Sequence, residues 1–388
     1  MKGSMKKRVR VLAVVIVLAM LFAGCEVKPK EASGGDSDAS GPEKSLQEHF
    51  DEIEPLDEEV ALNIGIGAGI LHDFPAYLAW KAGGLEKANV KGELMYFANG
   101  PLMVEALTAK SLDVGGYGIG GILAGTVLGE ADIIQIRMDE AIVQKYFVRA
   151  DSDIGEAGLD DETGLYGTKE QWQGKQIYLP QGTTLQYLLG EALAKMDMTF
   201  EDIEPVYMDA KNVNTAIYAG QGDAWALWNM YGYSAGLESE FVEAFNGVTA
   251  DISLLAASVA RKDALDDPEL TAAIGKWVEC QYAVIDWMQE SEENMNAAVD
   301  YFYEWCQEEG VMAEKDDLYR YMNDVQFYNA EECYDLMVNK GESGNLLGEE
   351  MILKPMDFFI SQGNYTEADK EKLTGGSFDP QFVEPLLK

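Results

Sequence analysis

The sequence predicts an α/β protein with two lobes and a helical C-terminal region. Residues 61–138 and 175–228 carry this prediction, because short apolar runs typical of strands alternate there with helical patterns. Such alternation is typical of a parallel sheet covered by helices. The last third of the chain is mainly helical in pattern, as in residues 268–290, where Trp277 and Tyr282 have the spacing of core residues.

The elements follow in order. The first stretch is expected to form strands at 61–69, 92–98, 112–118 and 132–138, with helices at 75–84 and 101–110. A further strand is expected at 145–151, followed by a glycine-rich and acidic break at 151–168. The second stretch is expected to form strands at 175–180, 203–208 and 223–228, with helices at 182–196 and 212–221.

A weak internal repeat relates the two stretches. Ala106–Val114 aligns with Ala216–Ala224, and each segment has Ala, a second Ala three residues later and Asp four residues after that. The repeat indicates two similar α/β halves. Open sheets of this class bind ligands at the carboxyl ends of their strands, so we expect the loops after the strands to form a site between the halves.

Composition restricts the partners. The chain has 388 residues, a formal net charge of −39 and 47% hydrophobic residues, which suffices for a large core. So acidic a surface repels phosphate backbones and excludes nucleic acid as an expected partner. No cofactor or metal is expected, because the sequence has no cluster of cysteine and histidine with zinc spacing. We expect Cys280, Cys306 and Cys333 to be buried free thiols on C-terminal helices.

The N-terminus resembles a bacterial lipoprotein signal. A basic segment precedes the apolar run Val11–Ala23, which is short for a bilayer span and ends in Leu21–Cys25, "LFAGC". Residues 1–24 are therefore predicted to be a signal peptide and Cys25 to carry acyl chains of the palmitate type; the alternative is an uncleaved membrane anchor. Residues 25–60 are predicted to be a flexible acidic tether, with a short helix near Ser45.

No catalytic apparatus is evident in the sequence, so the protein is not expected to be an enzyme. The two histidines are His49 and His72, and no GxSxG, HExxH or P-loop motif is present. An enzyme on the same fold remains the rival class, because fold alone does not decide function.

Several loops look suited to holding an anion. Gly182 precedes Thr183 and Thr184 at a predicted helix start, where unpaired N–H groups and the positive end of the helix dipole lie. The alternative is an ordinary helix cap. Asn99 and Gly100, and Tyr117 and Gly118, occupy similar positions between a strand and a helix. The remaining candidates are the first-loop residues His72, Asp73 and Phe74, and Trp228 at the end of an aromatic-rich strand.

Taken together, four segments resemble the solute-binding lipoproteins of bacterial ABC importers in the nitrate/sulfonate/taurine group. They are "LNIGIGAG…FPAYLAWKAGGLEKANV", "ANGPLMVEALTAKSLDVGGYG", "QWQGKQIYLPQGTTLQYLLGEALAKMDMTFEDIEPV" and "NTAIYAGQGDAWALW". The resemblance implies a two-lobed periplasmic-binding-protein fold of type II with two hinge crossovers. Lobe 1 would comprise residues 61–147 and 254–388, and lobe 2 residues 148–253.

The resemblance also implies the site, the partners and the location. Ligand would contact His72, Asp73, Phe74, Asn99, Gly100, Tyr117, Gly118, Thr183, Thr184 and Trp228. The expected protein is a monomer, lipid-anchored on the outer face of the bacterial cytoplasmic membrane, that delivers a small solute to an ABC permease and its ATPase subunits. A non-transport sensor on the same fold is the alternative.

The expected ligand class is a small oxyanion, namely a sulfonate, taurine or nitrate, held by hydroxyls and helix N–H groups. Arg137 is the one basic side chain nominated as a helper. If Asp73 faces the site, its charge instead favours a ligand with an amine, such as taurine, or a neutral heterocycle such as a thiamine-precursor pyrimidine.

Overall fold

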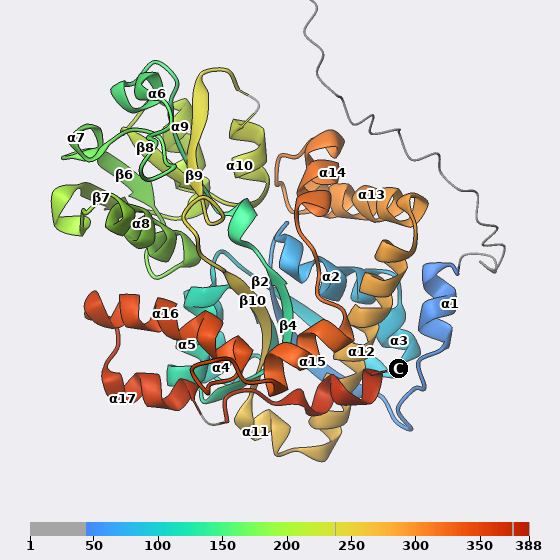
Figure 1. Cartoon of the computed structure of the whole chain (residues 1–388). Coiled ribbons are helices and arrows are strands. Elements are labelled where there is room, and N and C mark those ends of the chain that lie inside the picture. The colour runs from blue at the N-terminus through green and yellow to red at the C-terminus, as the bar shows by residue number, and fades with distance from the viewer. Residues whose placement is uncertain (1–43, 237, 375, 388) are drawn as a thin grey trace, which may run out of the picture. The chain divides into compact units, whose positions relative to one another are not determined.

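The computed structural model describes residues 44–236, 238–374 and 376–387. The predicted signal peptide at 1–24, the lipidated Cys25 and the first part of the predicted tether lie outside the described residues. Residues 43–388 form one compact unit, and the fold is that of this unit (Figure 1).

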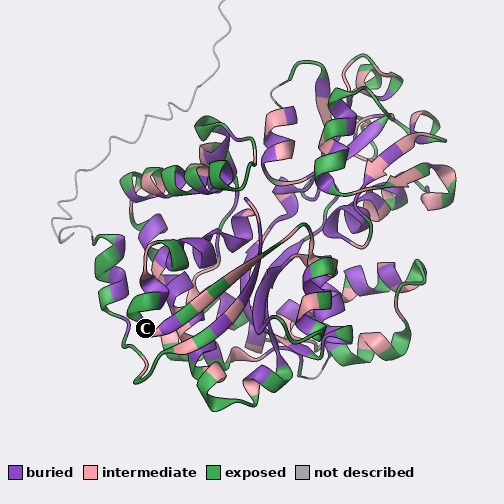
Figure 2. Ribbon diagram, turned by 180° about the vertical axis from the view of Figure 1, so that it is seen from behind, coloured by how far each residue is buried: buried purple, intermediate pink, exposed green. Residues whose placement is uncertain are grey.

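The first sheet has five strands in the order β2-β1-β3-β10-β4. Its strands are β1 (Val60–Gly67), β2 (Val90–Phe97), β3 (Val114–Tyr117), β4 (Ala131–Asp139) and β10 (Leu255–Arg261). Strand β1 pairs in parallel with β2 and β3, whereas β10 runs antiparallel to β3 and β4. Strands β3 and β10 are buried along their whole length, as Figure 2 shows for the middle of this sheet.

The second sheet repeats this plan in the order β7-β6-β8-β5-β9. Its strands are β5 (Lys145–Arg149), β6 (Gln176–Leu179), β7 (Glu204–Tyr207), β8 (Ala224–Leu227) and β9 (Phe241–Asn246). The strand in fourth place, β5, again runs antiparallel to both neighbours. The two-lobed architecture expected from the sequence is thus present, although the sequence did not predict β9.

The chain passes between the two sheets twice. Residues 140–144 lead from β4 to β5, and residues 247–254 lead from β9 to β10. The predicted lobe boundary at residue 147 falls inside β5, because Lys145 already pairs with Leu227 of β8. We therefore propose lobe boundaries at the two crossover segments.

Helices cover both sheets and form the C-terminal region. The helices of the α/β halves are α2 (Phe74–Lys81), α3 (Gly84–Lys87), α4 (Gly100–Thr108), α5 (Ile119–Leu128), α6 (Asp153–Ala157), α7 (Lys169–Trp172), α8 (Thr184–Lys195), α9 (Ala210–Tyr218) and α10 (Asn229–Ala235). The later helices are α11 (Lys262–Leu265), α12 (Pro268–Glu290), α13 (Glu292–Glu308), α14 (Lys315–Asp324), α15 (Ala330–Val338), α16 (Leu347–Ser361) and α17 (Glu367–Lys370). Short 3-10 turns are η1 (Leu71–Asp73), η2 (Ala141–Val143), η3 (Phe200–Asp202), η4 (Glu371–Leu373), η5 (Pro380–Phe382) and η6 (Glu384–Leu386).

Helix α12 has the bounds expected from its apolar spacing, because Asp267 caps its first turn and Pro268 occupies its first position. Trp277 and Tyr282 are buried, as predicted. Cys280, Cys306 and Cys333 lie on α12, α13 and α15 as buried free thiols, which confirms that prediction as well.

The predicted tether ends earlier than residue 60. Helix α1 (Leu46–Asp51) begins at Ser45, whose side chain and that of Glu48 form a capping box. Phe50 is 1% exposed and lies against Gly84, where an added β carbon would overlap its ring. The short helix expected near Ser45 is thus present, and its buried Phe50 places it in the folded unit, an apolar face that the polar composition of the segment conceals.

Within the described part of the chain, no helix is both long and apolar enough to cross a membrane. The same residues contain no group of three or more histidine, cysteine, aspartate or glutamate side chains placed to hold a metal ion.

Candidate ligand-binding site

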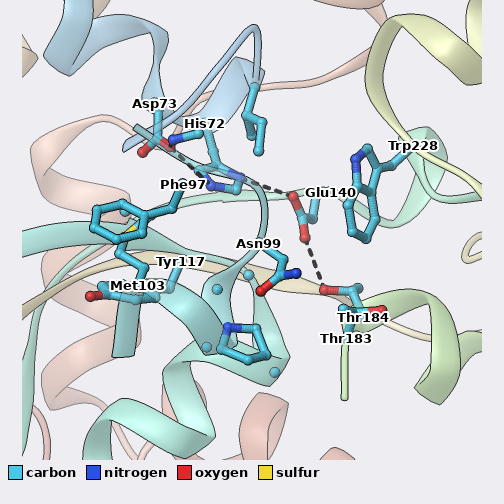
Figure 3. A pocket seen from close by; sticks show the side chains of 18 of the residues that line it. His72, Asp73, Phe97, Asn99, Met103, Tyr117, Glu140, Thr183, Thr184 and Trp228 are labelled. Atoms are coloured by element: carbon cyan, nitrogen blue, oxygen red, sulfur yellow. Dashed lines mark hydrogen bonds and ion pairs between the residues drawn. The ribbon is translucent and has the colours of Figure 1, made fainter. Parts of the chain in front are cut away.

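A cavity lies where strands of both sheets end. It is lined by residues that follow β1, β2, β3 and β4 of the first sheet and β6 and β8 of the second (Figure 3). The space open to the centre of a water molecule is about 60 Å³. This volume exceeds the 10–15 Å³ or so that one water needs, so the cavity as it stands accommodates a small solute.

Nine of the ten predicted site residues line this cavity. They are His72, Asp73, Asn99, Gly100, Tyr117, Gly118, Thr183, Thr184 and Trp228. The tenth, Phe74, does not line it. Its fully buried ring lies 5.0 Å from the ring of Phe302 and 6.4 Å from that of Trp305, centroid to centroid, because the first residue of α2 faces the helical core.

Four helices begin at the cavity. Asn99 caps α4 by accepting a hydrogen bond from the Leu102 N–H at 3.1 Å. Helices α5, α8 and α10 begin after Gly118, Thr183 and Trp228, and none of these three residues makes a side-chain cap. The N–H of Gln186 in the first turn of α8 donates to the Thr183 carbonyl oxygen at 3.1 Å. The starts of α5 and α8 place the positive ends of two helix dipoles at the cavity, which is an arrangement suited to an anion.

The threonine hydroxyls are engaged elsewhere in this arrangement. Thr183 Oγ1 donates to the carbonyl oxygen of Pro180 at 2.9 Å, and Thr184 Oγ1 lies 3.4 Å from Glu140 Oε1. The backbone N–H groups of α8, rather than these hydroxyls, are thus the donors that an oxyanion would meet.

Asp73 is buried and its charge is balanced by Arg137. The Arg137 Nη1 donates to Asp73 Oδ1 at 2.5 Å, and both side chains are at most 1% exposed. The Gly67 N–H donates to the other carboxylate oxygen at 2.8 Å. Arg137 Nε also donates to Ser258 Oγ at 2.9 Å. Arg137 is therefore a partner for Asp73 and does not line the cavity, so the carboxylate of Asp73 presents little net charge to a ligand.

Glu140 is a second carboxylate at the cavity, and it is not among the site residues predicted from the sequence. Its Oε2 lies 3.1 Å from His72 Nδ1, and Figure 3 shows the side chain between His72 and Thr184. Burial lowers the pKa of His72, but the charge of Asp73 and the hydrogen bond with Glu140 outweigh burial, so the pKa is raised above its ordinary value. When it is protonated, the imidazole forms a second buried charge pair with the Glu140 carboxylate.

The two halves of the molecule touch at this point. The Thr184 hydroxyl belongs to α8, which follows a strand of the second sheet, whereas Glu140 follows β4 of the first. Gly120 of α5 lies against the carbonyl oxygen of Gly182. Residues that follow different sheets are therefore in direct contact at the cavity.

Aromatic side chains complete the wall. Trp228 and Phe97 line the cavity, whereas Trp225 is fully buried in a separate core cluster under β8. This division agrees with the geometry of a β-strand, in which successive side chains point to opposite faces of the sheet.

No family model matches the sequence. A protein of Brucella abortus (strain 2308) named as a binding protein is 30% identical over 177 residues, which cover 44% of this chain and 49% of that relative. A protein of Escherichia coli (strain K12) named as an aliphatic sulfonates-binding protein is 29% identical over 155 residues, which cover 39% of this chain and 45% of that relative. The chain thus spans about half the length of these curated relatives.

Solved structures resemble the fold over a longer range. The alkanesulfonate-binding protein SsuA from Xanthomonas axonopodis pv. citri, bound to MOPS, matches with a TM-score of 0.59 and 20% identity, covering 80% of this chain and 96% of that one. The nitrate-binding protein NrtA from Synechocystis PCC 6803 matches with a TM-score of 0.58 and 13% identity, covering 81% and 85%.

A Candida albicans protein with the generic periplasmic binding protein fold also has a TM-score of 0.58, with 12% identity over 81% of this chain and 94% of that one. The chain therefore has the two-lobed periplasmic-binding-protein fold, and the resemblance to nitrate- and sulfonate-binding proteins that its sequence indicates is confirmed.

Proposed function

We propose that this protein is the solute-binding component of an ABC importer, which captures a small oxyanion-bearing solute between its lobes and delivers it to a permease. One observation carries the proposal: helices α5 and α8, which follow strands of different sheets, both begin at one cavity without side-chain caps. These two uncapped helix starts offer backbone donors and partial positive charge to an anion.

The ligand class that fits best is a sulfonate, including taurine, or nitrate. The cavity is small, and Asp73, which would otherwise repel an anion, is paired with Arg137 at 2.5 Å. The similar proteins include sulfonate- and nitrate-binding proteins, which supports the same class. We assign no chemical step to this chain, so ATP hydrolysis falls to the partner subunits.

The location and partners belong to the same proposal. Processing after residue 24 and acylation of Cys25 would hold the protein on the outer face of the cytoplasmic membrane, because stable attachment needs more than one acyl chain. The binding domain would act there as a monomer and would dock on the permease and its ATPase subunits.

A neutral heterocycle such as a pyrimidine is the second candidate ligand. The rings of Phe97 and Trp228 both line the cavity, and aromatic side chains favour stacking on flat ligands. This candidate retains the binding function and changes only the solute.

Thermal-shift screening of the purified full-length chain, followed by calorimetric titration, tests the proposal. We expect a sulfonate, taurine or nitrate to raise the melting temperature, because a ligand that binds the folded state stabilises it by mass action. Trp228→Ala should weaken binding, whereas Trp80→Ala, which removes a 40% exposed tryptophan outside the cavity lining, should not. If a pyrimidine binds and none of the oxyanions does, the ligand class is a neutral heterocycle instead of an oxyanion.

A further inference from the structure

The crossover segment between β4 and β5 brings two acceptor groups to the cavity. Glu140 precedes the 3-10 turn η2 and Gln144 follows it, and both line the cavity. They are 4% and 3% exposed. The two side chains therefore face the interior of the site and have little access to bulk water.

The Glu140 carboxylate is incompletely paired. An ionised carboxylate offers about four acceptor positions. The side-chain contacts of Glu140 in the structure are His72 Nδ1 at 3.1 Å and Thr184 Oγ1 at 3.4 Å. The second distance is longer than the 2.5–3.0 Å or so of a good O–H···O hydrogen bond. Oxygen Oε1 therefore has capacity for a further donor.

Gln144 provides an independent observation. Its amide oxygen is buried and has no hydrogen-bond partner among the described residues. A buried acceptor without a donor is destabilising, so its presence calls for a partner that the described residues do not supply. A ligand with N–H groups in the cavity would supply one.

The charges in the cavity agree with this interpretation. Arg137 already neutralises Asp73, and among the described residues the cavity lining includes no lysine or arginine. His72 is the one basic side chain in that lining, and it contacts Oε2 of Glu140 rather than Oε1. Oxygen Oε1 and the Gln144 oxygen are thus two acceptors that the crossover brings to the cavity, and Oε1 lies beside Thr184 and Gly118, at the starts of α8 and α5.

We propose that Glu140 and Gln144 are specificity-determining residues that bind a protonated nitrogen of the solute. The solute would then be a zwitterion, with its oxyanion at the starts of α5 and α8 and its ammonium group beside Glu140 and Gln144 of the crossover segment. This assignment rests on the proposed function, since it takes the oxyanion site as given, and it excludes nitrate as the preferred ligand.

Three sulfonates of nearly equal size isolate the nitrogen: taurine, isethionate and propane-1-sulfonate carry an ammonium, a hydroxyl and a methyl group at the same position. By calorimetric titration of the full-length chain, we expect taurine to bind at least about tenfold more tightly than propane-1-sulfonate, as a charge-assisted hydrogen bond implies. Glu140→Gln keeps the size of the side chain and removes its charge. It should abolish most of the preference for taurine over propane-1-sulfonate.

Gln144→Leu should reduce taurine affinity in the same selective way, because it removes the amide oxygen and keeps similar bulk. Equal affinity of the wild-type protein for all three sulfonates would overturn this assignment alone. Equal weakening of all three by Glu140→Gln would also overturn it, because that result indicates a purely structural role for the carboxylate. If no sulfonate binds, both this assignment and the sulfonate class proposed above fail. The comparison of the three sulfonates on the wild-type protein tests the assignment even if a variant does not fold.

Discussion

A β carbon on Gly120 would overlap the backbone carbonyl oxygen of Gly182. Gly120 lies in the first turn of α5, on the side of the first sheet, and Gly182 lies just before α8 of the second. Gly120 is not among the glycines with positive φ. Glycine is therefore needed at this position for close approach between the halves and not for its backbone conformation.

Gly120→Ala should hinder closure of the lobes and weaken solute binding by about tenfold or more, since even 1.4 kcal/mol of strain in the closed state has that effect. The melting temperature without solute should change little, because the lobes can relieve the overlap by opening. Calorimetric titration and thermal unfolding measure the two quantities. Gly125→Ala is the matched control in the same helix, because its β carbon would meet Val259 at an ordinary 3.5 Å. Equal affinities of the two variants would contradict the role of Gly120.

The pair of Asp73 and Arg137 should be important for stability. Arg137→Met leaves a fully buried carboxylate without its partner, and we expect a loss of about 3–5 kcal/mol in the free energy of unfolding by urea denaturation. Adding Asp73→Asn should recover part of this loss, because the unpaired charge is then removed. As a control, Lys315→Met breaks an exposed pair with Asp300 and should cost at most about 1 kcal/mol. Additive effects at 73 and 137 would argue against direct coupling.

His72 should make stability depend on pH. Burial lowers its pKa, but the charge of Asp73 and the hydrogen bond with Glu140 raise it above the ordinary 6.5 overall. The folded state therefore favours the protonated form, so this contribution to stability is complete below pH 6.5 and declines as pH rises through the folded-state pKa. Urea denaturation at pH values between about 6 and 9 should show this decline in the wild-type protein and a weaker one in His72→Gln. If the stability of both proteins declines equally with pH, His72 is not the source of the decline.

Helix α1 should contribute to the stability of the folded unit. Phe50 is 1% exposed, and Phe50→Ala should lower the free energy of unfolding by about 3 kcal/mol, as expected for truncation of a buried aromatic ring. Glu54→Ala, at an exposed position after the same helix, serves as the control and should change it by less than about 0.5 kcal/mol. If Phe50→Ala changes the free energy of unfolding as little as the control does, α1 belongs to the flexible tether and not to the folded unit.

The sequence was most informative where a strand ends at a loop. Asn99, Tyr117, Thr183 and Trp228 each follow an apolar run, and parallel strands of one sheet end at the same edge, so their convergence could be expected. Phe74 was misplaced because sequence position does not show which way the first residue of a helix points. The turn Leu71–Asp73 directs it into the core.

Glu140 and Gln144 were missed for a different reason. The chain has 68 acidic residues, so no single one stands out by composition. A signal was nevertheless present, because Glu140 follows an apolar run in the same way as the residues that were nominated. Strand β9 was missed because its six residues, "FVEAFN", follow no clear turn signal of the kind that marked the other strands. The pairing of Asp73 with Arg137 joins residues 64 positions apart, which spacing alone does not show.

The buried thiols described above bear on how the protein can be used as a reagent. The thiolate is the form that reacts with maleimide, and burial raises the pKa of Cys306 to about 12 and that of Cys333 to about 11, while Cys280 is fully buried. Within the described part of the chain, a cysteine introduced at exposed Lys211, which lines the same hollow as Trp228, would be the one thiol open to a fluorescent dye. The emission of that dye would then report occupancy of the neighbouring cavity without a competing label on Cys280, Cys306 or Cys333.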